Sequence, residues 1–285
     1  MYLYTDLIKD LKLMRARGAY VFSAGRSVLG ETIPAFTLGS RPPVALIHAG
    51  IHAREHVTVK LLMRLARDFC PKHSTMVFVP VANPDGMRIA QEGTAHLNAE
   101  QQSFILSLTD DVRTLKCNAR GVDLNVNFNA RWGEGALNVR HPAGANYVGP
   151  YPESEPETLA LIALTKRFRP VVSISLHARG SVIYWTFGMR PDYEAEFGEI
   201  AAKYQDSTGY PLLRAEGSVG GYKDWFIAEG YGMGLTVEVG SDDTPHHLLD
   251  REFNRIYSQT KEVLALADEH AATIYRRRIY GASRY

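Results

Sequence analysis

The sequence contains few cysteines, no excess of charge of one sign and no long apolar run. Its two cysteines, Cys70 and Cys117, cannot build a disulfide framework in a chain of 285 residues, so we expect a fold that does not depend on oxidation. The 32 basic and 31 acidic residues give a formal net charge of +1. This balance argues against a nucleic-acid partner, which requires a basic face. Nowhere do about eighteen apolar residues run together, so no membrane span is predicted.

The amino-terminal residues also lack the pattern of a secretory signal. Residues 1–6 contain no basic segment followed by an apolar one. We therefore expect a cytoplasmic protein, with a location outside the cytoplasm as the alternative if a signal has been removed. Hydrophobic residues make up 45% of the chain, which suffices for one sizeable core, and no repeat or linker divides the sequence. A single domain over residues 1–285 is expected.

Segments with helical and strand-like patterns alternate along the chain. The predicted helices are residues 4–17, 57–69, 154–168, 193–210 and 251–278, and the predicted strands are residues 43–50, 75–80, 171–176 and 234–239. This alternation predicts an α/β fold with a mixed, mostly parallel central sheet and helices on both faces. In such sheets, functional sites form where strands end and loops begin.

Two residues that could bind a metal follow the first of these strands. His52 and Glu55 lie three residues apart, between a predicted strand and a predicted helix. Zinc accepts imidazole nitrogen and carboxylate oxygen, and a catalytic site uses three protein ligands and keeps one position for water. A His-x-x-Glu pair alone is a weak signal, and ordinary surface residues are the competing interpretation.

Two further strands carry residues of the same chemical kinds. The strand over residues 171–176 leads directly to His177, which supplies a third ligand or, alternatively, a core histidine. Glu238 lies inside an apolar strand, where an ionised carboxylate is costly unless it faces a cleft or a partner. Burial would raise its pKa toward the range of a general base. Pairing with a structural arginine is the alternative for Glu238.

Seven motifs occur in an order that is typical of one family. They are residues 25–31 (Gly-x-Ser-x-x-Gly), 50–55 (Gly-x-His-x-x-Glu), 83–86 (Asn-Pro-Asp-Gly), 121–127 (Gly-Val-Asp-x-Asn-x-Asn), 175–177, 220–225 (Gly-Gly-x-x-Asp-Trp) and 236–238. With these motifs, the chain resembles the zinc carboxypeptidase family related to carboxypeptidase A. The resemblance extends over about residues 19–260.

The resemblance implies a role for each core residue. His52, Glu55 and His177 would bind the zinc cofactor, with water as the fourth ligand. Glu238 would take a proton from that water and pass it to the leaving amine. Asp123 matches a family residue that hydrogen-bonds the first zinc histidine, which fixes the imidazole tautomer. The resemblance therefore implies a zinc-dependent peptidase.

Three departures from the family pattern concern the substrate. Asn125 is retained, but Val126 replaces an arginine that grips the C-terminal carboxylate of ordinary peptides, and valine cannot make those charged hydrogen bonds. Lys116 falls nearest to the arginine that stabilises the oxyanion. A solvated surface charge is the alternative for Lys116. Glu216 occupies the place of a mobile tyrosine, for which Tyr222 is a nearby substitute.

These departures are similar to the pattern of bacterial γ-D-glutamyl-L-diamino acid peptidases. The corresponding stretches are residues 116–125, 128–132, 147–157 and 221–227. That branch cuts murein peptides between γ-linked D-glutamate and meso-diaminopimelate, so the resemblance implies a small peptide substrate rich in carboxylates. Arg54, inside the metal motif, and Arg179, just after His177, are candidate carboxylate partners.

Two other functions remain open at this stage. One is a zinc carboxypeptidase or deacylase of the same family that acts on another small acidic peptide or amide. The other is a catalytically inactive module that binds peptidoglycan peptides. All four core residues are present, which argues against the inactive module. The adjacent histidines His246 and His247 are interpreted as a loop pair and not as a second metal site.

Overall fold

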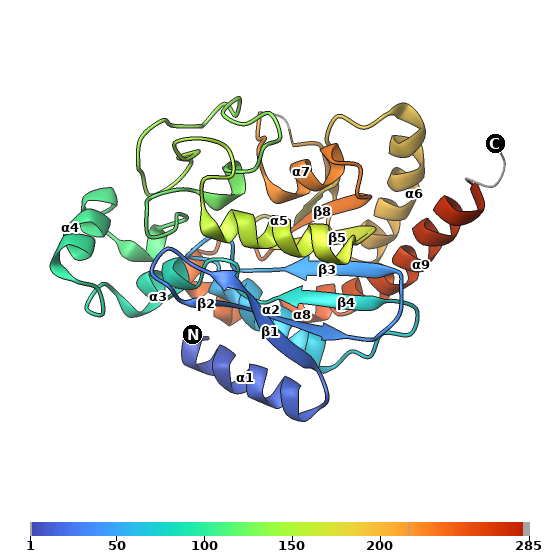
Figure 1. Ribbon diagram of the computed structural model, residues 1–285, viewed down its shortest axis with the longest axis horizontal. Helices are drawn as coiled ribbons and strands as arrows, with labels where there is room; N and C mark the ends of the chain where they lie inside the picture. The colour runs from blue at the N-terminus through green and yellow to red at the C-terminus, as the bar shows by residue number, and fades with distance from the viewer. Residues whose placement is uncertain (1, 216, 282–285) are drawn as a thin grey trace.

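The computed structural model describes residues 2–215 and 217–281, and within them a single mixed sheet of eight strands organises the fold (Figure 1). The strand order is β1-β2-β4-β3-β5-β8-β6-β7. The strands are β1 Tyr20–Arg26, β2 Thr32–Leu38, β3 Val44–His48, β4 Thr75–Val79, β5 Val172–Ala178, β6 Val182–Tyr184, β7 Leu212–Leu213 and β8 Met233–Val239.

The centre of the sheet is parallel and its margins are antiparallel. Strands β4, β3, β5 and β8 pair in parallel, one after another. At one margin β2 pairs antiparallel with both β4 and β1, and at the other β6 pairs antiparallel with β8 and parallel with β7. The predicted mixed, mostly parallel sheet is confirmed.

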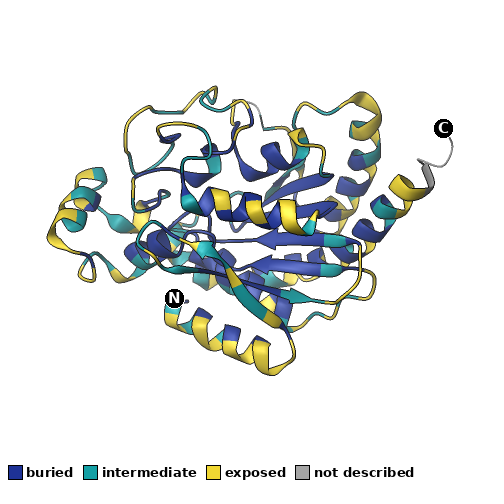
Figure 2. Ribbon diagram, in the orientation of Figure 1, coloured by how far each residue is buried: buried dark blue, intermediate teal, exposed yellow. Residues whose placement is uncertain are grey.

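Helices cover both faces of this sheet, as predicted. One face packs on α5 Pro156–Phe168 and α7 Tyr222–Ala228, and the other on α1 Tyr4–Ala16, α2 His56–Arg67, α6 Pro191–Thr208, α8 Phe253–Thr260 and α9 Val263–Gly281. The central strands are buried, whereas α5 exposes its outer side (Figure 2). The helices α3 Pro84–Glu92 and α4 Ala99–Leu108 lie at one end of the molecule, with α4 projecting outward (Figure 1).

The structure corrects the predicted long helix over residues 251–278. A 3-10 turn, His246–Glu252, leads into α8, and residues 261–262 separate α8 from α9. The hydroxyl of Thr260 donates a hydrogen bond to the carbonyl of Ile256 at 2.7 Å, a contact that bends or ends helices. The β1–β2 hairpin was not predicted. No helix in the described part of the chain has the length and apolar character needed to cross a bilayer.

The sheet brings the candidate site residues to one edge. His177 in β5 lies directly opposite Glu238 in the parallel register with β8. The chain leaves the adjacent strand β3 through Gly50, whose φ of +57° belongs to the left-handed region. A Cβ at Gly50 would lie 2.8 Å from Val59 Cγ2, so only glycine fits this turn. The turn carries His52 to the same edge as His177.

Candidate active site

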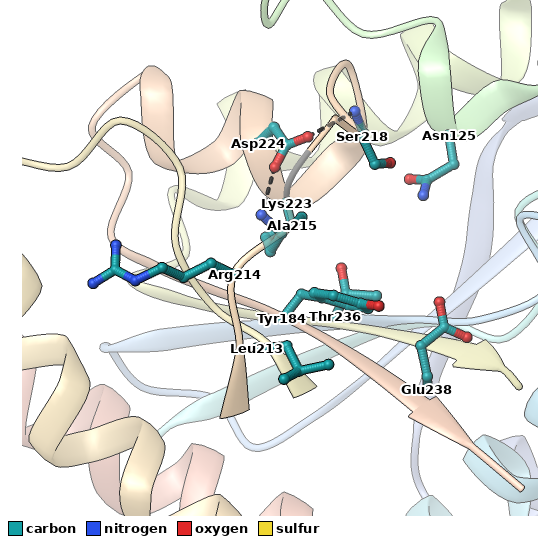
Figure 3. A pocket seen from close by; sticks show the side chains of 11 residues that line it. Asn125, Tyr184, Leu213, Arg214, Ala215, Ser218, Lys223, Asp224, Thr236 and Glu238 are labelled. Atoms are coloured by element: carbon teal, nitrogen blue, oxygen red, sulfur yellow. Dashed lines mark hydrogen bonds and ion pairs between the residues drawn. The ribbon is translucent and has the colours of Figure 1, made fainter. Parts of the chain in front are cut away.

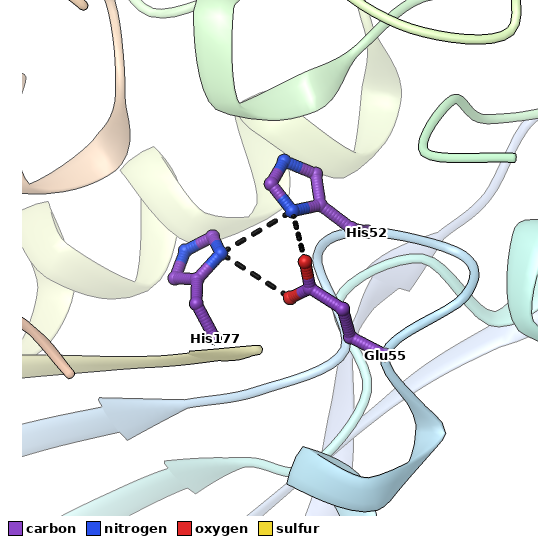
Figure 4. A group of neighbouring side chains, drawn as sticks. All are labelled: His52, Glu55 and His177. Carbon is purple, nitrogen blue, oxygen red and sulfur yellow. Dashed lines mark hydrogen bonds and ion pairs between the residues drawn. The ribbon is translucent and has the colours of Figure 1, made fainter. Parts of the chain in front are cut away.

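Three side chains meet at this edge with their donor atoms facing one another (Figure 4). His52 Nδ1 lies 2.7 Å from Glu55 Oε1, and His177 Nδ1 lies 3.3 Å from both His52 Nδ1 and Glu55 Oε2. All three side chains are buried. The sheet therefore brings the three predicted metal ligands together in one cluster.

The spacing of these atoms fits a tetrahedral metal. Bonds of about 2.0–2.1 Å from zinc to nitrogen or oxygen place two tetrahedral ligands about 3.3–3.4 Å apart. The two distances of 3.3 Å match this value, and the third is shorter. Glu55 Oε2 is buried and has no hydrogen-bond partner within the described chain. Two imidazoles and one carboxylate are also the ligand types that zinc accepts in catalytic sites.

The charges around His52 favour a cation at this point. Burial alone would lower the pKa of His52, but the carboxylates of Glu55 and Asp123 outweigh it and raise the pKa to about 9. Burial likewise opposes ionisation of Glu55, yet His52 and His177 hold the pKa of its carboxyl well below the usual value. The site therefore retains two ionised carboxylates beside two imidazoles, an environment that suits a divalent cation.

Asp123 holds His52 from the side opposite the cluster. Asp123 Oδ1 lies 3.2 Å from His52 Nε2, so the proton of His52 stays on Nε2 and Nδ1 is left free for a ligand bond. Backbone N–H groups of Asn125 and Asn146 donate to the two carboxylate oxygens at 3.1 Å. These bonds fix the carboxylate that fixes the imidazole.

The loops that carry these residues are tied together by Asn83. Its side-chain amide donates to the carbonyls of Ile51 and Cys117 at 3.3 and 3.1 Å, while its Oδ1 caps α3 by accepting from Gly86 N. The backbone of Ala53 also donates to Lys116 O at 3.2 Å. The Asn-Pro-Asp-Gly motif therefore has a structural role between the two loops.

Glu238 opens onto a polar pocket next to the cluster. The cavity has a volume of about 380 Å³, and Glu238 points across it toward Asn125 (Figure 3). Burial, together with the negative charge of Glu55, raises the pKa of Glu238 to about 7, against the opposing effects of His177, His52 and Lys116. A carboxyl with this pKa exchanges protons near neutral pH, as a general base requires.

Three other predicted residues border the site. The positive charge of Lys116 lowers the pKa of both Asp123 and Glu238, which places its ammonium group near both carboxylates. Burial and the charges of Arg54 and Arg179 lower the pKa of His246 to about 4, although the carboxylate of Glu55 opposes them.

His246 is thus next to the site, although the sequence assigned it no role. It lies 3.0 Å from the carbonyl oxygen of Ala178. The two arginines are held by carbonyls as well: Arg54 donates to Thr114 O at 3.2 Å, and Arg179 to Thr244 O at 2.8 Å. Both arginines are only partly exposed.

Tyr222 does not take the predicted place beside the substrate. Its side chain is fully buried, and its hydroxyl shares a hydrogen bond of 2.7 Å with Thr165. The ring packs edge-on against His48 and Phe128 in the core. The structure therefore leaves this side chain no surface for a ligand, and only the backbone N–H of Tyr222 borders the site, donating to Asn125 Oδ1 at 3.2 Å. Glu216 lies outside the described residues.

Sequence reasoning missed three side chains that line the pocket. They are Tyr184, Arg214 and Lys223. Lys223 lies within the Gly-Gly-x-x-Asp-Trp motif, at a position that the motif leaves unspecified, so a lysine there was a signal that could have been used. Tyr184 and Arg214 have no such local signal, because only strand pairing brings them to the pocket.

Comparison with known proteins identifies the family. The family model described as zinc carboxypeptidase matches residues 4–263. The chain belongs to the zinc carboxypeptidase family. It is therefore a zinc metallopeptidase by family, and that family is zinc-dependent.

Two curated relatives of this peptidase act on bacterial cell-wall peptides, according to their names. Gamma-D-glutamyl-L-diamino acid endopeptidase 1 of Lysinibacillus sphaericus is 29% identical over 282 residues, covering 90% of this chain and 70% of the relative. Murein peptide amidase A of Escherichia coli K12 is 32% identical over 161 residues, covering 54% of this chain and 57% of the relative.

Solved structures share the fold of this peptidase. Bovine thrombin-activatable fibrinolysis inhibitor superposes with a TM-score of 0.78 at 20% identity, covering 96% of this chain and 98% of that one. The murein-tripeptide amidase from Escherichia coli O157 superposes with a TM-score of 0.56 at 25% identity, covering 90% and 94% of the two chains.

Replacing Asp123 tests how strongly the peptidase depends on an oriented His52. We expect Asp123→Asn to weaken zinc binding by about 10- to 100-fold, because the amide supplies less charge and can favour the wrong imidazole tautomer. Competition with a chromophoric chelator measures this affinity directly. Unchanged zinc affinity, with the fold intact by circular dichroism, would contradict the orienting role.

Proposed function

We propose that this peptidase holds zinc through His52, Glu55 and His177 and hydrolyses the amide bond between γ-linked D-glutamate and meso-diaminopimelate in murein peptides. The observation that carries the chemistry is the convergence of the three donor groups beside a carboxyl, Glu238, that opens onto a pocket. The substrate is supported by the charges around the pocket and by the named activities of the two cell-wall relatives.

Each protein group has a definite task in this reaction. When bound, zinc lowers the pKa of a water molecule and polarises the scissile carbonyl. Glu238, ionised above its pKa of about 7, accepts the proton of the attacking water. The same carboxyl then donates that proton to the leaving nitrogen, which departs as a neutral amine. Lys116 supplies positive charge to the oxyanion that develops between these steps.

Cationic groups stand on two sides of the reacting centre. Arg54 and Arg179 gather near His246 on one side, and Lys223 and Arg214 line the pocket on the other. A peptide with carboxylates on both sides of the scissile bond complements this arrangement, because charged hydrogen bonds to guanidinium and ammonium groups are the strong ones. The γ-D-glutamyl–diaminopimelate bond has such carboxylates on both sides.

The clamp for ordinary C-terminal residues is absent from this pocket. Val126, at the place of the family arginine, is an apolar side chain with 9% exposure. Asn125 beside it lines the pocket and can donate a hydrogen bond, but it carries no charge. This substitution favours murein peptides over standard peptides as substrates.

A second candidate is carboxypeptidase action on another small acidic peptide. It is favoured by the polar, lysine-bearing pocket and by similarity to human carboxypeptidase A6, which is 27% identical over 188 residues. A binding module without catalysis has less support, because all four groups needed for hydrolysis are present.

Hydrolysis of two peptides, followed by mass spectrometry, separates these candidates. We expect the zinc-loaded protein to cleave L-Ala-γ-D-Glu-meso-diaminopimelate, and chelation of zinc to stop the reaction. A standard peptide with a free C-terminus should be cleaved much more slowly. Preferential cleavage of the standard peptide would show that Val126 is no barrier and that the substrate proposal is wrong. Binding of the murein peptide without cleavage would favour the module.

A further inference from the structure

One face of β8 presents three positions to the pocket in a regular row. Side chains alternate along a strand, so Glu238, Thr236 and Gly234 share a face, while Val237 and Leu235 lie in the core on the other. The antiparallel partner β6 places Tyr184 directly opposite Thr236. Tyr184 therefore lies on the pocket face, one two-residue step from Glu238 (Figure 3).

Tyr184 offers a free hydrogen-bond donor at this step. Among the described residues, no hydrogen bond of its hydroxyl is present, although the side chain is only partly exposed. Burial and the negative charges of Glu238 and Asp242 raise the pKa of Tyr184, so the phenol keeps its proton. A neutral phenol beside a reacting centre donates to an anionic group of the substrate.

Lys223 stands one further step along the same strand. Its stem packs on Gly234, where a Cβ would approach Lys223 Cγ to 3.2 Å. Its ammonium group donates to Thr186 O at 2.8 Å and contacts Asp224 Oδ1. Only 6% of the side chain is exposed. An ammonium has three donors, so one remains for a ligand in the pocket.

The spacing of these groups acts as a ruler. A strand advances about 7 Å per two residues, so Tyr184 and Lys223 follow Glu238 at successive steps of about this length. Diaminopimelate carries two carboxylates on carbons separated by four bonds, which reach about 5 Å when extended. Their carboxyl groups add reach at both ends.

Resting on the proposed function, we propose that Tyr184 and Lys223 form a two-point receptor for the residue that leaves with the amine. Tyr184 donates to the carboxylate next to the cleaved amide, and Lys223 binds the carboxylate at the far end of the side chain. Together they replace the guanidinium that Val126 lacks. The receptor selects a diamino dicarboxylic acid over lysine, which has no distal carboxylate.

Asp224 completes the distal half of this receptor. The distal carbon of diaminopimelate also carries an ammonium group. Asp224 lines the pocket beside Lys223, and its other oxygen accepts from Gly221 N at 3.2 Å. A carboxylate has about four acceptor positions, so capacity remains for a ligand ammonium. The adjacent Lys223 and Asp224 therefore match a zwitterionic end.

The test combines protein variants with substrate variants. The substrates are L-Ala-γ-D-Glu-X, where X is meso-diaminopimelate, its distal carboxamide, the carboxamide next to the cleaved bond, or L-lysine. We expect Lys223→Met to lower kcat/KM about 10- to 100-fold on the diaminopimelate peptide and little on the lysine and distal-amide peptides. Tyr184→Phe should lower it about 10-fold, except on the carboxamide next to the cleaved bond. Equal losses on all four substrates would overturn the receptor.

Binding of free meso-diaminopimelate, measured by calorimetry, gives a readout independent of turnover. We expect saturable binding to the parent and at least tenfold weaker binding to each variant, while Tyr20→Phe and Lys60→Met, outside the pocket, bind as the parent does. If the parent cleaves no murein peptide but binds diaminopimelate in this way, the proposed function fails and the receptor stands. Absence of binding by the parent overturns the receptor, even where the peptide is cleaved.

Discussion

Replacing Glu238 by glutamine is expected to lower kcat about 10³-fold while zinc remains bound. Glutamine keeps the shape of the side chain but cannot accept a proton, and general base catalysis contributes about 10²- to 10⁴-fold. Glu238 is absent from the cluster of donor atoms formed by His52, Glu55 and His177, so metal content should be unchanged. Steady-state kinetics and metal analysis of the same preparation measure both quantities. Loss of zinc together with activity would show that Glu238 acts on the metal site and not on the proton.

Stability against pH supplies the control for this variant. The pKa of Glu238 in the folded protein, about 7, lies above its ordinary value of 4.5. The protonated carboxyl thus favours the folded state below pH 4.5, and this contribution is lost as the pH rises through 7. The glutamine variant does not ionise, so without metal its melting temperature should gain on that of the parent between pH 5 and pH 8. A variant that melts well below the parent at pH 8 would mark a folding defect.

Replacing His177 by alanine is expected to abolish both zinc binding and hydrolysis. Only two of the three donors would remain, too few for a catalytic zinc site. Zinc at about 100 times its dissociation constant should stabilise the parent by about 2.7 kcal/mol and leave the variant unchanged. Thermal melts with and without zinc measure this difference without any substrate.

His247→Ala provides the matched histidine control, because His247 is exposed and lies outside the donor cluster. It should bind zinc and hydrolyse substrate as the parent does. A His177→Ala protein that keeps one tightly bound zinc would place the metal elsewhere.

Local sequence patterns sufficed to predict the core of the site. His52, Glu55, His177 and Glu238 all occur within or next to strongly apolar strands, so their chemistry stood out against the surrounding residues. The parallel order of β3, β5 and β8 then determines that the carboxyl ends of these strands meet. The structure brings the three predicted metal ligands together and places Glu238 directly across from His177.

The pocket was harder to predict, because it depends on register between distant segments. Tyr184 reaches it only because β6 pairs antiparallel with β8 in one particular register, and a shift of one residue would turn the phenol into the core. Tyr222 shows the converse. It was assigned to the pocket from its position in a motif, but it points into the core, whereas its neighbour Lys223 lines the pocket.

The misjudged elements have equally physical causes. The β1–β2 hairpin contains strands that are only partly buried or lie at the edge of the sheet, so its apolar pattern is weak. The end of the chain has apolar residues at helical spacing throughout, which hides the break at residues 261–262. Periodicity alone does not reveal the Thr260 hydrogen bond that ends α8.

Anomalous diffraction at the zinc absorption edge, from crystals of the zinc-loaded protein, tests the central claim most directly. The account predicts one strong peak within bonding distance, about 2.0–2.2 Å, of His52 Nδ1, His177 Nδ1 and the Glu55 carboxylate. It also predicts that Glu238 lies across from this peak without binding it. A peak on another group of residues, such as His246 and His247, or no peak at the cluster, would contradict the account.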